Sequence, residues 1–212
     1  MEEPTHDHAI RGRFHAWFLS TTESVMERIH GDRKRALFSR LSGTIIELGP
    51  GTGSNCRHYP PNSSVIGIEP NIRMHGLLHE NAERHEVNLE IRGLKGEKLD
   101  LQPNCADAVI CTLVLCSVDD PAGVVAEAMR VLRPGGRFIF IEHVAATPGT
   151  WLRRIQNAVQ PTWTWCFEGC RPNRETARVL EEAGFSQLEM EAFRIRSPFF
   201  HVAPHVAGVG LK

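Results

Sequence analysis

Residues 44–53 read Thr-Ile-Ile-Glu-Leu-Gly-Pro-Gly-Thr-Gly, and this stretch decides the fold. Its first half is a short apolar β run. Its second half carries glycine at positions 49, 51 and 53, just before a helical start at Ser54 and Asn55. Glycines at these positions allow a tight turn and let a ligand approach the bare backbone. The arrangement is typical of a ligand-binding loop, although a glycine-rich loop alone also occurs as a plain β-to-α turn.

Strand-like and helix-like segments alternate from residue 44 toward the C-terminus. Such alternation predicts an α/β fold with a parallel sheet and helices on both faces. We therefore expect a Rossmann-like, doubly wound, mostly parallel seven-stranded sheet whose last two strands form an antiparallel edge hairpin. The expected strands are 44–49, 64–69, 87–92, 106–118, 137–142, 186–195 and 205–211, and the expected helices are 71–84, 121–132 and 173–184.

A prefix with a different pattern precedes the first strand. Apolar positions recur there at steps of three and four, which predicts an amphipathic helical cap; they are Phe14, Trp17, Phe18, Thr21, Val25 and Ile29. Residues 27–40 add five basic and two acidic side chains. Three interpretations stay open: a helix packed on the domain with a solvated charged face, a lid over a substrate pocket, or a weak contact with a membrane surface.

The whole chain, residues 1–212, is expected to form one domain, because no linker or repeat interrupts it. We divide it into a helical cap, a ligand-binding core, an aromatic segment that contacts substrate, and a C-terminal helix with strands. The expected bounds are 1–41, 42–143, 144–170 and 171–212.

The composition excludes several classes of protein. Hydrophobic residues make up 42% of the 212 residues and charged residues 23%, which is too apolar for a chain that is mainly disordered. A net charge of −1 argues against a surface that coats nucleic acid. The sequence has no apolar run long enough for a transmembrane segment and no secretory apolar core. We expect a soluble, cytoplasmic protein.

The six cysteines also fit a reducing compartment, since four of them lie in apolar or aromatic runs that suit packed thiols. Cys166 and Cys170 are spaced C-x3-C, but no second cysteine pair and no histidine cluster lies near them in the sequence. Structural zinc needs four clustered ligands, so we expect no metal site.

An acidic residue supports a ligand-binding role for the glycine loop. Glu69 ends the next predicted strand, 18 residues after Gly51, where a carboxylate can accept both hydroxyl groups of a ribose. The loop pattern is neither the dinucleotide fingerprint nor a P-loop for a triphosphate. The expected ligand is a nucleoside with a short charged tail.

Three features of the sequence together resemble the class I S-adenosylmethionine-dependent methyltransferases. They are Glu47 with the glycines up to Gly53, then Glu69, and then residues 130–136 (Arg-Val-Leu-Arg-Pro-Gly-Gly) before a hydrophobic strand. The resemblance covers about residues 44–143. It implies S-adenosylmethionine as cofactor and S-adenosylhomocysteine as product. It further implies a cofactor site formed by Glu47, Gly49, Pro50, Gly51, Thr52, Gly53, Glu69, Pro70, Leu94, Lys95, Gly96, Thr112 and Leu113.

The resemblance gives these residues separate tasks. The glycine loop would lie against the methionine moiety with Glu47 beneath it, and Glu69 would hold the ribose. Residues 111–113 would offer a carbonyl to the ammonium group of the cofactor. Lys95 stands where the family often has an acidic residue beside the adenine, so backbone groups of Leu94 and Gly96 would make that contact instead.

A narrower resemblance extends from about residue 26 to the C-terminus. Several segments resemble the animal methyltransferase-like subgroup that methylates alkyl thiols. They are residues 33–41, 111–118, 130–136, 142–146, Trp151, and 167–170 with the following Arg174-Glu175. That subgroup carries an N-terminal hydrophobic membrane anchor, whereas the first residues of this sequence, MEEPTHDHAIRGRF, are charged.

The chemistry of transfer suggests candidate acceptor-side residues. His143, just after the fifth predicted strand, is the best candidate for a general base, with a hydrogen-bonded structural histidine as the alternative. Cys111 and Cys116 are interpreted as packing near the cofactor. An aromatic cluster predicts an apolar substrate wall, for which packing alone is the alternative; the expected substrate-binding residues are Phe14, Trp17, His143, Trp151, Trp163, Phe167 and Phe199.

Three functions follow from this reading, and the first is the leading hypothesis. In the first, the chain methylates a small, hydrophobic thiol by in-line displacement. In the second, it methylates an oxygen or nitrogen atom of small secondary metabolites. In the third, it binds S-adenosylmethionine without catalysis. The expected partner is a small-molecule acceptor and not a nucleic acid. The sequence does not predict the oligomeric state.

Overall fold

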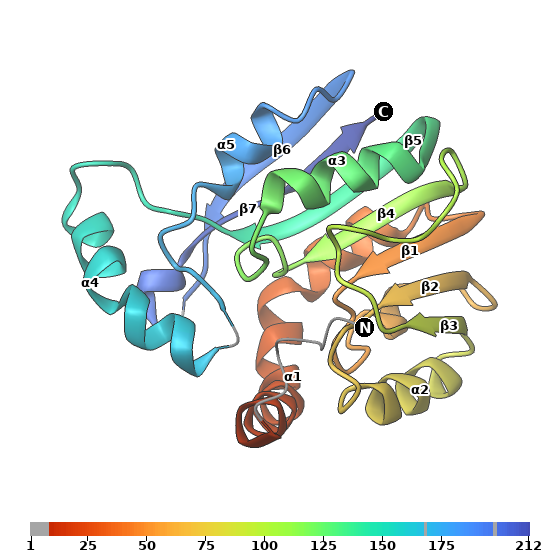
Figure 1. Ribbon diagram of the computed structural model, residues 1–212, viewed down its shortest axis with the longest axis horizontal. Helices are drawn as coiled ribbons and strands as arrows, with labels where there is room; N and C mark the ends of the chain where they lie inside the picture. Colours follow the sequence, from red (N-terminus) through yellow and green to blue (C-terminus); the bar gives the residue numbers. More distant parts are fainter. Residues whose placement is uncertain (1–8, 168, 197–198) are drawn as a thin grey trace.

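A seven-stranded sheet in the order β3-β2-β1-β4-β5-β7-β6 forms the centre of the molecule (Figure 1). The computed structural model describes residues 9–167, 169–196 and 199–212, with side chains from Ser24 onward except that of Phe200. The strands from β3 to β5 are parallel to one another, and β7 runs antiparallel to both β5 and β6. The predicted Rossmann-like sheet with an antiparallel C-terminal edge is confirmed. The strands are β1 Thr44–Leu48, β2 Ser64–Ile68, β3 Asn88–Arg92, β4 Ala106–Thr112, β5 Leu132–His143, β6 Gln187–Arg194 and β7 Pro204–Leu211.

Helices cover both faces of this sheet, which explains why its central strands are almost continuously apolar. Ile46 and Leu48 of β1 face a buried cluster that includes Val124 of α3. Ile45 points to the opposite face and packs in a second cluster with Phe38 of α1. The helices are α1 Ala9–Phe38, α2 His75–Arg84, α3 Pro121–Val131, α4 Trp151–Cys166 and α5 Thr176–Glu181, with short 3-10 helices η1 Cys56–His58 and η2 Phe200–Val202.

The predicted strand 106–118 is wrong in its second half, because β4 ends at Thr112. Leu113 adopts a positive φ of 59°, which an extended strand does not allow. The backbone N–H groups of Val114 and Leu115 then donate to the buried carboxylate of Glu142, at 2.8 and 3.1 Å. The apolar run is therefore a strand followed by a turn over the carboxyl ends of the sheet, and the apolar side chains of this turn pack on the core.

Smaller differences from the predictions lie in the last third of the chain and around β5. Residues 151–166 form the helix α4, capped by Thr150, where the sequence predicted only an aromatic segment. The helix α5 begins at Thr176 and not at 173, because Glu175 holds the N-cap position. Residues 133–136, which lie between the expected helix 121–132 and the expected strand 137–142, bulge out within β5, since the pairing with β4 jumps from Leu132 to Arg137.

The helix α1 is the predicted cap, and it lies beside the carboxyl-terminal end of the sheet (Figure 1). Phe38 at its end stacks on Tyr59, with ring centroids 5.6 Å apart. Glu27 contacts His58 at 2.9 Å, so the helix is also tied to η1. Phe14 and Trp17 belong to α1, but their side chains lie outside the described residues. Within the described ranges, no helix is both long and apolar enough to cross a membrane.

His30 of α1 gives the fold a dependence on pH. Its ring is buried beside His205, 5.2 Å between centroids. Burial first, then the nearby His205, Lys34 and Arg33, lower the pKa of His30 to about 3. The unfolded chain therefore binds a proton that the folded chain does not between about pH 6.5 and 3, so this contribution to stability is present above pH 6.5 and is lost as the pH falls.

We predict that the free energy of unfolding in urea decreases from pH 7 to pH 5, and that His30→Gln makes this decrease smaller. A single histidine accounts for at most about 1.4 kcal/mol per pH unit. The exposed His79, changed to Gln, is the matched control and should leave the slope unchanged. An identical slope in the protein and in His30→Gln would contradict the assignment.

Candidate active site

The glycine loop after β1 turns against the loop after β4. Gly49 and Gly51 have φ angles of 58° and 57°, in the left-handed region that favours glycine. A Cβ atom on Gly49 would lie 2.6 Å from Cγ2 of Val114, so only glycine allows the two loops to approach this closely. The two loops meet between β1 and β4, where the order of the sheet changes direction and where ligands of open α/β sheets bind.

Glu69 follows β2 directly and is 6% exposed. One carboxylate oxygen accepts the N–H of Gly51 at 2.9 Å, and the other accepts the N–H of Asn71 at 2.9 Å. This carboxylate therefore stands at the rim of the glycine loop, held in place by backbone. Carboxylate oxygens keep further acceptor positions, which suits a pair of vicinal hydroxyl groups.

Glu47 lies below the loop and is buried. It accepts hydrogen bonds from Asn55 Nδ2 at 2.7 Å and from the Tyr59 hydroxyl at 2.8 Å. Burial raises the pKa of Glu47, although these two hydrogen bonds oppose the shift. Asn55 also donates to Thr112 Oγ1 at 2.8 Å, so this network ties the chain after the loop to the end of β4.

The other residues predicted on the cofactor side lie on the same edge of the sheet. Pro50 and Thr52 are buried within the loop, and Pro70 is exposed just after Glu69. Leu94, Lys95 and Gly96 follow β3, with Gly96 so close to Val124 of α3 that an added Cβ atom would come within 3.3 Å of it. Leu113 ends the row, immediately after β4.

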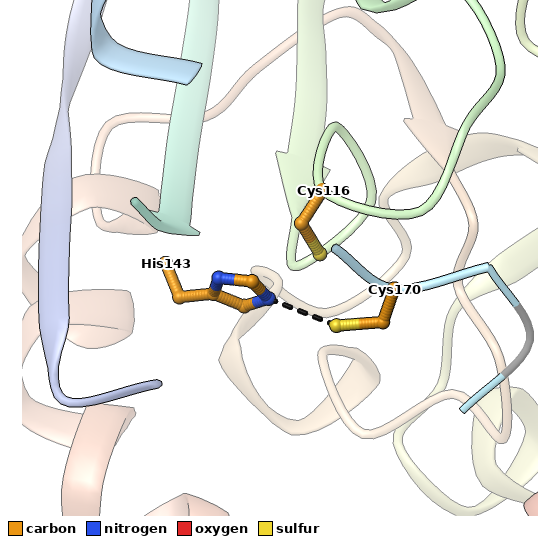
Figure 2. Close-up of side chains that lie close together, drawn as sticks. All are labelled: Cys116, His143 and Cys170. Atoms are coloured by element: carbon orange, nitrogen blue, oxygen red, sulfur yellow. Dashed lines mark hydrogen bonds between the residues drawn. The ribbon is translucent and has the colours of Figure 1, made fainter. Parts of the chain in front are cut away.

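Three side chains converge at the end of β4 and β5 (Figure 2): Cys116 from the turn after β4, His143 from the end of β5, and Cys170 from the loop after α4. Their sulfur and nitrogen atoms lie within 4.8 Å of one another. His143 Nε2 is 3.0 Å from Cys170 Sγ, and the indole N–H of Trp163 donates to the same sulfur at 3.2 Å. Cys116 and His143 are buried, and Cys170 is partly exposed as a residue, although its thiol group lies almost wholly within the protein.

The surroundings shift the pKa values of this cluster in different directions. Donating a hydrogen bond to Cys170, together with burial, raises the pKa of Cys116. The hydrogen bonds that Cys170 receives from Cys116 and then from Trp163 lower its pKa despite burial. Burial works to lower the pKa of His143, but the neighbouring Cys116 and Glu142 outweigh it and raise that pKa. Of the two thiols, Cys170 is therefore the one whose pKa the surroundings lower, and it lies beside an imidazole whose pKa they raise.

Aromatic rings line one side of the cluster. The ring centroids of Phe167, His201 and Phe199 lie 4.1, 4.3 and 5.3 Å from that of Trp163. The structure thus brings together three residues of the predicted substrate wall, Trp163, Phe167 and Phe199. Trp151 is separate: it is 64% exposed and lines a cavity of about 410 Å³ together with Phe193 and His205.

Sequence reasoning missed two members of this cluster. Cys116 was interpreted as packing, and Cys170 was compared only with Cys166, which does not belong to the cluster. Cys116 and Cys170 lie far apart in the chain, and the three residues of the cluster, His143 included, form no local motif in the sequence. A useful signal was available only for Cys116 and His143, since both follow neighbouring parallel strands.

Comparison with known proteins decides the family. A family model described as a methyltransferase domain matches residues 46–140. The human thiol S-methyltransferase TMT1A is 36% identical over 207 residues, which cover 92% of this chain and 85% of that protein. The chain belongs to the S-adenosylmethionine-dependent methyltransferases. The human thiol S-methyltransferase TMT1B is 39% identical and covers 85% of this chain and 78% of its own length.

Solved structures of other methyltransferases have the same fold as this methyltransferase. A SAM-dependent methyltransferase from Thermotoga maritima superimposes with a TM-score of 0.64 at 20% identity, covering 94% of this chain and 99% of the other. The cofactor of the family is S-adenosylmethionine, and the residues present fit it. Gly49 and Gly51 of the loop are partly exposed and have no side chains, so the amino-acid end can approach them closely, and the fixed carboxylate of Glu69 suits the ribose hydroxyls.

We predict that Glu69→Ala weakens binding of S-adenosylhomocysteine about 10- to 100-fold, because charge-assisted hydrogen bonds to the ribose are lost. Titration calorimetry measures this affinity. Glu90→Ala, an exposed carboxylate on the neighbouring strand β3, is the matched control and should bind like the unchanged protein. Equal affinity of the two variants would refute the ribose assignment.

Proposed function

We propose that this methyltransferase moves a methyl group to the sulfur of a small, apolar thiol. One observation carries the proposal: Cys116, His143 and Cys170 meet at the edge of the sheet that holds the glycine loop, and this group suits a sulfur acceptor. The names of the two human relatives, both thiol S-methyltransferases, support the same acceptor.

Proximity to the cofactor side supports a role for this cluster in transfer. Val114, which touches Gly49, stands two residues before Cys116 in the same turn. His143 ends the strand next to β4. An acceptor in contact with this cluster would therefore face the methionine end of a ligand on the glycine loop, as in-line displacement requires.

The cofactor supplies a methyl group that is already activated as part of a sulfonium. The protein then has to align the acceptor and favour its ionised form. We assign that second task to His143, whose imidazole accepts the S–H proton of the acceptor and so leaves the acceptor as a thiolate. The thiolate sulfur forms the new bond to the methyl carbon as the bond from that carbon to the sulfonium breaks. Opposite charges cancel in this step, so a site poor in water suits it.

The aromatic rings supply the apolar surface for the remainder of the acceptor. Trp163, Phe167 and Phe199 form one wall, and Phe14 and Trp17 of the cap are proposed to complete it from α1. The cavity beside Trp151 is of the size that small-molecule sites have and would take a longer tail. This aromatic surface selects hydrophobic molecules. The Cys116–His143–Cys170 cluster then determines which acceptor atom is methylated.

We also propose a cytoplasmic location for this reaction. All six cysteines lie among the described residues and none of them is in a disulfide, as expected in a reducing compartment. The excess of basic side chains in residues 27–40 favours a weak contact with a membrane surface, which would bring apolar acceptors to the site.

The identity of the acceptor atom is tested with three compounds that share the same hexyl chain and differ only in the acceptor group. Purified protein and S-adenosylmethionine are incubated with 1-hexanethiol, 1-hexanol and hexylamine, and the methylated products are measured by mass spectrometry. We predict transfer to the thiol alone. Transfer to the alcohol or the amine with none to the thiol would replace the proposal by O- or N-methylation, and cofactor binding with no transfer at all would indicate a binding module.

The role of His143 gives a second prediction. His143→Ala should lower kcat/KM for 1-hexanethiol about 100-fold, because the acceptor is no longer stabilised as a thiolate. The loss should be much smaller for thiophenol, an aryl thiol that ionises far more readily, and the affinity for S-adenosylhomocysteine should stay unchanged. Equal losses for both thiols together with weaker cofactor binding would indicate a purely structural histidine.

A further inference from the structure

The Cys116–His143–Cys170 cluster has the composition of a metal site as well as the position of an acceptor site. It presents two sulfur atoms and one imidazole nitrogen from three separate segments, all within 4.8 Å. Zinc takes thiolate and imidazole ligands at about 2.3 and 2.1 Å, so tetrahedral geometry places ligand atoms about 3.5 to 4 Å apart. The distance of 3.0 Å between His143 Nε2 and Cys170 Sγ would open by a small side-chain rotation.

The backbone holds the two cysteine segments together independently of their side chains. The N–H of Arg171 donates to the carbonyl oxygen of Cys116 at 2.9 Å. Gly169 has a φ of 90°, and a Cβ atom there would lie 2.8 Å from the carbonyl oxygen of Ser117. The loop after α4 is thus fixed against the turn after β4, and both thiols are already directed to one point.

The surroundings of the cluster suit a metal site better than they suit a pair of cysteines that forms a disulfide. The indole N–H of Trp163 donates to Cys170 Sγ, the kind of outer contact that stabilises a coordinated thiolate. A disulfide between Cys116 and Cys170 would leave the buried ring of His143 without a role in the group. A set of three protein ligands leaves the fourth position of zinc to another group, which is the arrangement of catalytic and not of structural zinc.

We propose that Cys116, His143 and Cys170 bind one Zn²⁺ ion, and that the open fourth position takes the sulfur of the acceptor thiol. The proposal rests on thiol methylation as the function, and it makes His143 a zinc ligand in place of a proton acceptor. When the acceptor binds, its S–H proton passes to water and its sulfur becomes a zinc-bound thiolate. In transfer, a lone pair of that sulfur bonds to the methyl carbon, the carbon–sulfonium bond breaks, and the neutral thioether leaves the metal.

The metal is measured first, apart from activity. Protein purified under reducing conditions with any tag removed should contain about one zinc per chain, and its cobalt form should show thiolate-to-cobalt charge transfer in the near ultraviolet. Cys170→Ser should weaken cobalt binding about 100-fold or more, and Cys116→Ser should do the same. Cys166→Ser, a cysteine in α4 outside the cluster, is the matched control and should bind like the unchanged protein. Absence of the charge-transfer band from the unchanged protein would overturn the proposal.

Folding is checked in the same variants, because Cys116 is buried. Circular dichroism and binding of S-adenosylhomocysteine should match those of the unchanged protein. Should Cys116→Ser fail to fold, Cys170→Ser carries the test, since Cys170 is the less buried of the two residues. A folded Cys170→Ser variant with undiminished cobalt affinity would overturn the proposal.

The fourth position is tested with 1-octanethiol and 1-octanol added to the cobalt form. The thiol should add charge-transfer intensity and shift the visible bands, and the alcohol should do neither. A cobalt spectrum that does not respond to the thiol would overturn the assignment of this position. Full thiol methylation by protein freed of metal with a chelator would overturn the zinc proposal and leave the proposed function intact. A zinc-loaded protein that methylates no thiol would contradict the function itself.

Discussion

The buried carboxylate of Glu142 is the interaction on which the site depends. It lies in β5 with no exposed surface and accepts the N–H groups of Val114 and Leu115. Burial raises the pKa of Glu142 to about 7, although those two N–H groups work to keep it ionised. These hydrogen bonds turn the chain out of β4 immediately after Thr112. The same turn then places Val114 against the glycine loop and Cys116 beside His143.

This turn joins the two halves of the reaction. On one side, Glu69 and the glycine loop form a site for a nucleoside cofactor that is fixed mainly by backbone hydrogen bonds. On the other side, two thiols and an imidazole lie together, with the indole N–H of Trp163 donating to Cys170, and we propose that the acceptor binds there. The two halves are in contact at Gly49 and Val114. The distance between donor and acceptor is therefore a property of the fold, as methyl transfer by alignment requires.

The part of the site built on local chain geometry could be predicted from the sequence. A strand followed by alternate glycines, with an acidic residue after the next strand, located Gly51 and Glu69 correctly on one edge of the sheet. The end of β4 could not be predicted, because Leu113–Val118 is as apolar as a strand and the carboxylate that bends it lies 27 residues or more away in the chain. The convergence of Cys170 with Cys116 depends on how α4 returns to the sheet, which is a tertiary contact and leaves no periodicity in the sequence.

The central claim is that the acceptor sulfur meets the cofactor methyl at the Cys116–His143–Cys170 cluster. The most direct measurement is a crystal structure with S-adenosylhomocysteine and 1-octanethiol bound together. The thiol sulfur should lie between the cluster and the cofactor sulfur, with room for one methyl group on the line that joins the two sulfur atoms. A thiol bound with its sulfur away from the cluster, for example in the cavity beside Trp151 and Phe193, would contradict the account.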